Sequence, residues 1–118
     1  PICLTGQDGP AGENGFMTGP EAEALLAECR RKIDAIDRQL RDLLNQRAEI
    51  VDGVVRAKET LGMPVHEPKR EEEVVRRAAN GNPGPLGDEA FRNIFEVIMR
   101  EMRNLQQMYL DRQQEKAK

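Results

Sequence analysis

The segment Arg47-Ala-Glu-Ile-Val-Asp-Gly-Val-Val-Arg-Ala-Lys58 (RAEIVDGVVRAK) lies inside a long apolar repeat and carries a cation at each end. Apolar residues recur about every seven positions on both sides of it, a spacing typical of one helix face, which we call the seam. Arg47 occupies a slot of this seam. The other seam positions are Leu26, Cys29, Ile33, Ile36, Leu40, Leu43, Ile50, Val54, Ala57 and Leu61. An arginine in an apolar stripe requires a physical explanation.

The seam predicts one long helix over residues 20–61. Pro20 suits the first helical position and Glu21 suits the positive end of the helix dipole, while Gly62 and Pro64 stop the pattern. Such a helix is about 63 Å long at 1.5 Å per residue, whereas a compact domain of this size is only roughly 35 Å across. Because the helix overhangs its own domain, the seam needs a second chain. A homodimer is therefore predicted.

Two further helices are expected. Pro68 opens a short one that ends at Asn80-Gly81, and Asp88 begins a third with a Phe91-to-Tyr109 apolar stripe. No strand pattern is found, so the fold class is all-α with three helices per chain, one of them very long.

The expected domain is residues 20–112. The glycine-rich residues 1–19 are expected to be a flexible tail, because such a tract buries too little to order itself. Met17 is a candidate native start, so part of this tail is a candidate for non-native sequence. The polar residues 113–118 are expected to fray.

Composition excludes several classes of function. The chain has 118 residues, a net charge of −3 and 3% aromatic residues, which does not favour nucleic-acid binding. No apolar run is long enough to span a membrane and no export leader is visible, so we expect a cytoplasmic protein without membrane contact. Serine is absent and His66 is the only histidine. A serine nucleophile is thus impossible, and neither a metal nor a cofactor is expected.

Several charged side chains point inward by their spacing. Arg47 and Lys58 are eleven residues apart, so they differ by only about 20° around the helix axis. Arg30 lies about 100° from Arg47 and should face a different partner surface. In the short helix, Arg70 and Glu71 come one turn before an apolar pair. In the third helix, Gln106 lies beside the apolar stripe.

These cations admit two interpretations. Each alone is most simply a snorkelling or register-setting residue, as in coiled coils. Several together, without a matching number of inward acids, favour a different explanation, because burying an unpaired charge costs several kcal/mol. Arginine's planar fork suits a carboxylate. The pattern therefore predicts a pocket for a small polyanion.

Three stretches, RRKIDAIDRQLRDLLNQRAEIVDGVVRAK, MPVHEPKREEEVVRR and NPGPLGDEAFRNIFEVIMREMRNLQQ, resemble the all-α class of chorismate mutases. The resemblance covers residues 24–107 and includes the order, spacing and type of the polar residues. It implies an intertwined helical homodimer that converts chorismate to prephenate, on the route to phenylalanine and tyrosine. The reaction is a rearrangement within one molecule, which needs no nucleophile and no proton transfer.

The resemblance also implies roles for individual residues. Arg30 would reach from the partner chain to a substrate carboxylate, and Arg47 would bind a carboxylate within its own chain. Lys58 and Gln106 would donate to the ether oxygen whose bond to carbon breaks.

On the short helix and beside it, the resemblance implies that Arg70 adds positive charge and Glu71 holds the ring hydroxyl. Two positions depart from the commonest family pattern. Glu67 stands where an aspartate is usual, and Met102 stands where a serine often helps to bind a carboxylate. Weaker substrate binding is expected from Met102.

Three alternatives stay open. An isochorismate-pyruvate lyase shares this fold, but that family tends to lack the acid at Glu71. A plain helical dimerisation module would tolerate Arg47→Leu and gain stability from a continuous seam. The domain could also serve mainly as a regulatory partner of another enzyme of the pathway.

Overall fold

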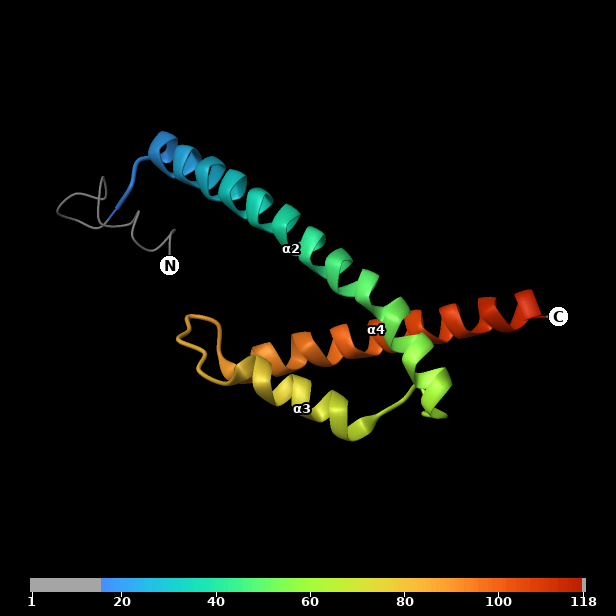
Figure 1. Ribbon diagram of the computed structural model, residues 1–118. Helices are drawn as coiled ribbons and strands as arrows, with labels where there is room; N and C mark the ends of the chain where they lie inside the picture. The colour runs from blue at the N-terminus through green and yellow to red at the C-terminus, as the bar shows by residue number, and fades with distance from the viewer. Residues whose placement is uncertain (1–15, 118) are drawn as a thin grey trace. The chain divides into compact units, whose positions relative to one another are not determined.

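The computed structural model describes residues 16–117 and contains three helices, labelled as in Figure 1. Helix α2 spans Gly19–Leu61, α3 spans Pro68–Ala79 and α4 spans Asp88–Ala117. No strand occurs among the described residues, so the all-α prediction is confirmed. The chain divides into two units, residues 1–44 and 45–118, which are described separately below. The residues 1–15 of the expected tail lie outside the described part.

Helix α2 begins with a capping box. The Thr18 backbone N–H donates to Glu21 Oε1 at 2.9 Å, and the Glu21 N–H donates to Thr18 Oγ1 at 3.2 Å. The two residues thus satisfy each other's free backbone donors, and the bond from the Thr18 N–H lowers the pKa of Glu21. The helix starts at Gly19, one residue before the expected Pro20, and Thr18 is an ordered cap instead of part of a tail. The T-x-x-E spacing carries this signal in the sequence.

Helix α2 ends as Gly62 predicts. Gly62 adopts a positive φ of 67°, a conformation that glycine reaches without strain. The Met63 N–H donates to the Lys58 carbonyl at 2.8 Å and the Gly62 N–H to the Glu59 carbonyl at 3.2 Å, the two bonds of a Schellman motif. The chain reverses here, which brings the Val65 carbonyl back to the last turn of α2.

The face of α2 that packs within residues 45–117 is adjacent to the seam and distinct from it. Val51, Val55 and Lys58 are its buried residues. The seam residues of the same stretch stay open, with Ile50 68% exposed and Leu61 70% exposed. In residues 16–44 the apolar seam positions are likewise exposed: Leu26, Ile33, Ile36, Leu40 and Leu43. One chain alone therefore leaves a continuous apolar stripe uncovered.

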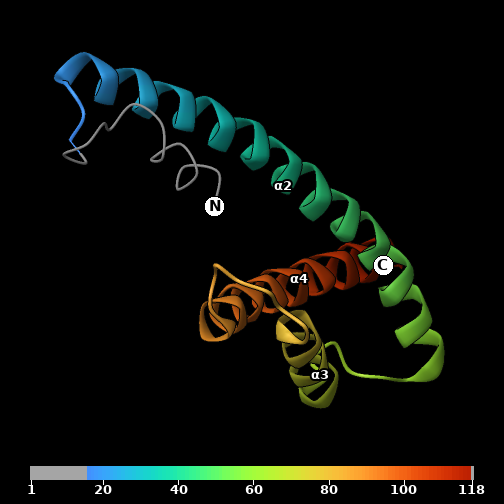
Figure 2. The same cartoon turned by 90° about the vertical axis from the view of Figure 1, so that its left-hand side faces the viewer.

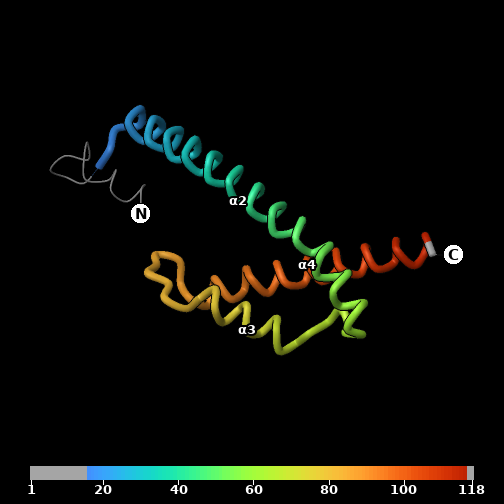
Figure 3. The backbone as a smooth tube through the Cα atoms, in the orientation of Figure 1, coloured from blue at the N-terminus to red at the C-terminus, as the bar shows by residue number. Residues whose placement is uncertain are grey.

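Helices α3 and α4 lie side by side, as the two views in Figures 1 and 2 show. Ala79 of α3 and Met99 of α4 are buried, together with Val51 and Val55 of α2. Figure 3 traces the loop between the two helices. There, Asn82 Nδ2 donates to the Leu86 carbonyl at 2.7 Å and to Asp88 Oδ1 at 2.8 Å, which fixes the start of α4.

Helix α4 continues to Ala117, beyond the expected domain end at residue 112. The physical reason is that residues 111–117 hold no glycine or proline and consist mostly of good helix formers. Gln107 Nε2 also donates to Asp111 Oδ1 one turn later, at 2.9 Å. No helix within the described range is long and apolar enough to cross a bilayer.

Candidate active site

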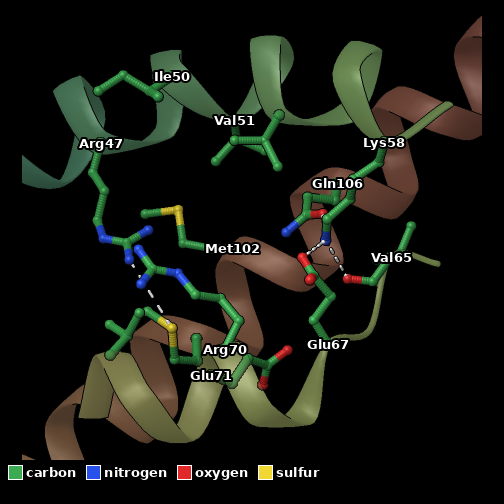
Figure 4. Close-up of a pocket in the computed structure, with 13 residues that line it drawn as sticks. Arg47, Ile50, Val51, Lys58, Val65, Glu67, Arg70, Glu71, Met102 and Gln106 are labelled. Atoms are coloured by element: carbon green, nitrogen blue, oxygen red, sulfur yellow. Dashed lines mark hydrogen bonds and ion pairs between the residues drawn. The ribbon is translucent and has the colours of Figure 1, made fainter. Parts of the chain in front are cut away.

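A cavity of about 330 Å³ opens within residues 45–118, between the end of α2 and the pair α3 and α4 (Figure 4). Its volume suits a small molecule. Its polar wall holds six of the seven predicted site residues: Arg47, Lys58, Glu67, Arg70, Glu71 and Gln106. The apolar lining is Ile50, Val51, Val54, Val65, Val74, Met99 and Met102. The sequence pattern thus names most of the polar residues that the fold brings together.

One end of the cavity is organised around Lys58, the buried charged residue of α2. Its ammonium donates to the Val65 carbonyl at 2.8 Å and to Gln106 Oε1 at 2.9 Å, and it lies 3.0 Å from Glu67 Oε1. An ammonium group has three N–H donors, so these three oxygens satisfy it. The Gln106 carbonyl is committed to Lys58, which leaves the Gln106 amide N–H₂ directed toward the interior of the cavity.

The other end of the cavity is a guanidinium pair. Figure 4 shows Arg47 and Arg70 pointing toward each other from α2 and α3, with Met102 between this end and Lys58. Arg47 is half-buried and contacts Met99 Sδ at 4.0 Å, and no carboxylate of residues 16–117 forms an ion pair with it. Burial lowers the pKa of Arg47, and the charge of Arg70 lowers it further. Arg70 itself pairs with Glu73 on its own helix.

The prediction that the inward cations lack acidic neighbours is correct for Arg47 and wrong for Lys58 and Arg70. The partner of Lys58 is Glu67, the N-cap residue of α3, whose side chain makes no capping bond to its own helix. Its carboxylate is therefore free to reach the end of α2. Helical periodicity cannot place a residue between two helices, so this pair was not visible in the sequence pattern.

Glu71 is held by a residue that the sequence reasoning missed. Arg103 of α4 donates from Nε to Glu71 Oε2 at 3.0 Å and from Nη2 to Oε1 at 3.1 Å. The hydrogen bond from Arg103 is the main reason that the pKa of Glu71 is lowered, and the charges of Arg103, His66 and Lys58 act in the same direction against burial. The only sign of this pair in the sequence is the position of Arg103 itself, directly after Met102 on the third helix.

Arg30 lies on α2 in residues 16–44 and is exposed. It is not among the residues that line the cavity. One chain therefore assembles six of the seven predicted residues, and the place of the seventh stays a prediction.

Comparison with known proteins identifies the family of this chain. The chorismate mutase type II family profile matches residues 29–107, and the chain belongs to that family. A chorismate mutase of Methanocaldococcus jannaschii is 33% identical over 94 residues, covering 79% of this chain and 95% of that relative.

Two further relatives extend the comparison. A bifunctional chorismate mutase/prephenate dehydratase of Neisseria gonorrhoeae is 38% identical over 79 residues, which are 67% of this chain and 21% of that protein. The crystal structure of chorismate mutase from Helicobacter pylori in complex with prephenate is similar with a TM-score of 0.68 and 31% identity. That match covers 75% of this chain and 96% of the other.

Proposed function

We propose that this chain is a chorismate mutase, an isomerase that rearranges chorismate to prephenate in the synthesis of phenylalanine and tyrosine. The observation that carries the proposal is the division of the cavity into two ends. Arg47 and Arg70 offer positive charge at one end, and Lys58 with Gln106 offers hydrogen-bond donors at the other. An intramolecular rearrangement needs such a shaped, charged container and no nucleophile or acid–base pair.

The guanidinium end binds carboxylate. Arg47 is a half-buried cation without an acidic partner among the described residues, so an incoming anion relieves both its desolvation and its repulsion from Arg70. The planar fork of a guanidinium donates two parallel hydrogen bonds to the two oxygens of a carboxylate. Anchoring the substrate at this end holds the two reacting carbons of the folded molecule near one another.

The Lys58 end stabilises the transition state. Negative charge gathers on the ether oxygen as its bond to carbon breaks, and a donor aimed at that oxygen strengthens in the transition state. The free amide N–H₂ of Gln106 is one such donor. Lys58 supplies the second when the ether oxygen replaces one of its three present acceptors. The acceptor that gives way is the carboxylate of Glu67, whose side chain makes no capping bond to its own helix.

Two residues of the cavity wall, Glu71 and Met102, bear on how the substrate is bound. Glu71 lies in the wall between the two ends and accepts the ring hydroxyl, a role that its low pKa suits because the ionised carboxylate is a pure acceptor. Met102 lies between the guanidinium end and Lys58 and carries no hydroxyl, so the substrate loses one hydrogen bond there. The consequence is a raised KM with the chemistry intact.

We further propose that the functional unit is a homodimer in which Arg30 of each chain completes the site of the other. The cavity borders the seam, because Ile50 and Val54 belong to both. A second chain that covers the exposed seam would therefore also close the cavity. Burying that stripe is favourable by about 25 cal/mol per Å² of apolar surface. A cytoplasmic location and a partner enzyme of the pathway stay predictions.

The test of activity is to incubate the purified protein with chorismate and, separately, with isochorismate, and to identify each product. Prephenate supports the proposal. Pyruvate released from isochorismate would instead indicate a lyase on the same fold, and no turnover of either substrate would indicate a dimerisation or regulatory module. The acid at position 71 favours prephenate as the product, because the lyase family tends to lack an acid there.

The dimer is tested by mixing two inactive variants. Arg30→Ala and Arg47→Ala each remove one anion contact from every site of their own homodimer. After subunit exchange, half of the dimers are mixed, and each of these has one site with both arginines intact. Activity should therefore return to about a quarter of the wild-type value per chain. No recovery, with exchange shown by mass spectrometry, would place both arginines in the same chain's site.

A further inference from the structure

The Glu71–Arg103 pair joins α3 to α4 with a bidentate geometry. The two bonds, 3.0 Å and 3.1 Å, engage both carboxylate oxygens, so they fix the plane of the carboxylate as well as its position. The side chains are partly sheltered, with exposed fractions of 21% for Glu71 and 32% for Arg103. Within residues 16–117, this ion pair is the one that joins the polar wall of the cavity to a charged side chain of α4.

Arg103 lies on the far side of Glu71 from the substrate cavity. A second cavity, also of about 330 Å³, is lined by Glu71, Arg103, His66 and Glu96 among others. Glu71 lines both cavities, whereas Arg103 lines only the second. Arg103 therefore has no direct access to a molecule in the first cavity, and any influence on that molecule passes through the Glu71 carboxylate.

The charges around the substrate cavity explain what Arg103 contributes through Glu71. Its wall holds three cations, Arg47, Lys58 and Arg70, and two acids. Glu67 already neutralises Lys58. If Glu71 also turned inward to bind a cation of the wall, it would compete directly with an anionic substrate. Arg103 holds Glu71 from outside the cavity, which keeps this carboxylate from competing with the substrate for Arg47 and for Arg70, whose present partner is Glu73 of α3.

We propose that Arg103 is a positioning residue: it aims the Glu71 carboxylate at the substrate hydroxyl and keeps it from pairing with the cations that bind the substrate. This inference rests on the proposed function. The groups that face Glu71 are Arg103 from α4, Lys58 from α2 and His66 from the loop between α2 and α3, with His66 Nε2 4.0 Å from Glu71 Oε2. Without Arg103, Glu71 would be free to turn toward either of the other two.

The decisive experiment is a double-mutant cycle of Arg103→Met and Glu71→Gln, with KM and kcat measured for chorismate. The ring hydroxyl is remote from the breaking bond, so its contact should act on ground state and transition state alike. Arg103→Met should therefore raise KM by about tenfold or more, with a smaller change in kcat. In the Glu71→Gln background the same substitution should have almost no further effect, because its target is already gone.

Two more variants separate positioning from a general structural role. Arg103→Lys keeps the charge and should recover part of the KM. Arg100→Met removes an exposed arginine of the same helix whose ion pair within residues 16–117 is with its neighbour Glu101, and it should behave as wild type. Additive effects in the cycle, or an unchanged KM in Arg103→Met, would overturn the proposal.

The failure of this inference can be told from failure of the proposed function. If the wild-type protein does not rearrange chorismate, the proposed function is wrong, and the Glu71–Arg103 pair must be tested without substrate. NMR titration of the Glu71 carboxyl in the wild type, which needs no substrate and no variant, then tests the pair itself. The carboxyl should titrate below its ordinary value. A Glu71 pKa at or above that value would overturn the role of Arg103, even if Arg103→Met fails to fold.

Discussion

Replacing Arg47 by leucine should lower kcat/KM strongly and at the same time stabilise the protein. Arg47 is half-buried, it lacks an acidic partner among residues 16–117, and its neighbour Arg70 repels it. Replacing a poorly compensated buried charge with an apolar side chain of similar volume is often stabilising. Because Arg47 is only partly shielded from solvent, we discount that gain to about 0.5–1 kcal/mol. For a domain of this size, such a gain raises Tm by roughly 2–8 °C.

The effect on activity has the opposite sign. Removing one partner of a desolvated ion pair with a ligand costs about 2–5 kcal/mol, so kcat/KM should fall by roughly thirtyfold or more. The assay follows the disappearance of chorismate, and thermal unfolding is measured at one fixed protein concentration, since a dimer's Tm depends on concentration. Arg56→Leu is the matched control, because Arg56 is an exposed arginine of the same helix paired with Asp52.

Two results would refute this reasoning. Wild-type turnover in Arg47→Leu would show that Arg47 does not bind the substrate. A lower Tm of Arg47→Leu would show that the charge of Arg47 is compensated in the folded protein, for example by a carboxylate of a partner chain. Loss of activity combined with higher stability would also exclude the plain dimerisation module, for which only the stability should change.

Further measurements test other parts of the site. Lys58→Ala should lower kcat by about 10²–10³-fold with helicity retained by circular dichroism, as expected for a lost donor to a developing oxyanion; near-normal kcat would contradict its role. Met102→Ser should lower KM several-fold, on the order of one added hydrogen bond, and an unchanged KM would show that no carboxylate lies there. Thr18→Ala should cost about 1 kcal/mol of stability through loss of the capping box, without changing kcat. Because the pKa of Glu71 is lowered in the folded state, its ionised carboxylate stabilises the fold above the unfolded pKa of about 4.5, and this stabilisation should be lost as pH falls through the lower folded pKa. The urea midpoint should therefore fall less steeply with decreasing pH in Arg103→Met than in the wild type. Equal slopes in the two proteins would contradict the role of the Glu71–Arg103 pair.

The helices were predictable because their signals are local. The bounds of α2 follow from a repeat, a proline–acid start and a glycine stop, each of which acts within one or two turns. The inward positions of Arg47 and Lys58 follow from the same 100° arithmetic, because they share one helix. The bounds of α3 follow likewise, from Pro68 at its start and Asn80-Gly81 at its end.

The partners of those cations were not predictable, because they come from other elements. Glu67 reaches Lys58 only because the Schellman turn at Gly62 reverses the chain, and Arg103 meets Glu71 only because α3 packs on α4. Neither angle nor distance between elements is contained in a helical repeat. The same limit applies to the seam: periodicity predicted an apolar face, but not that Val51 and Val55 beside it would be the residues buried within the chain.

The three oxygens around Lys58 have a consequence for the energetics of ligand recognition. This ammonium is solvated by three oxygen atoms of the polypeptide itself. Removing the hydration shell of a cation has a large free-energy cost, and for Lys58 this cost is already included in the free energy of folding. Arrival of the substrate then becomes an exchange of one oxygen ligand for another, with little dipolar rearrangement left for the catalytic step.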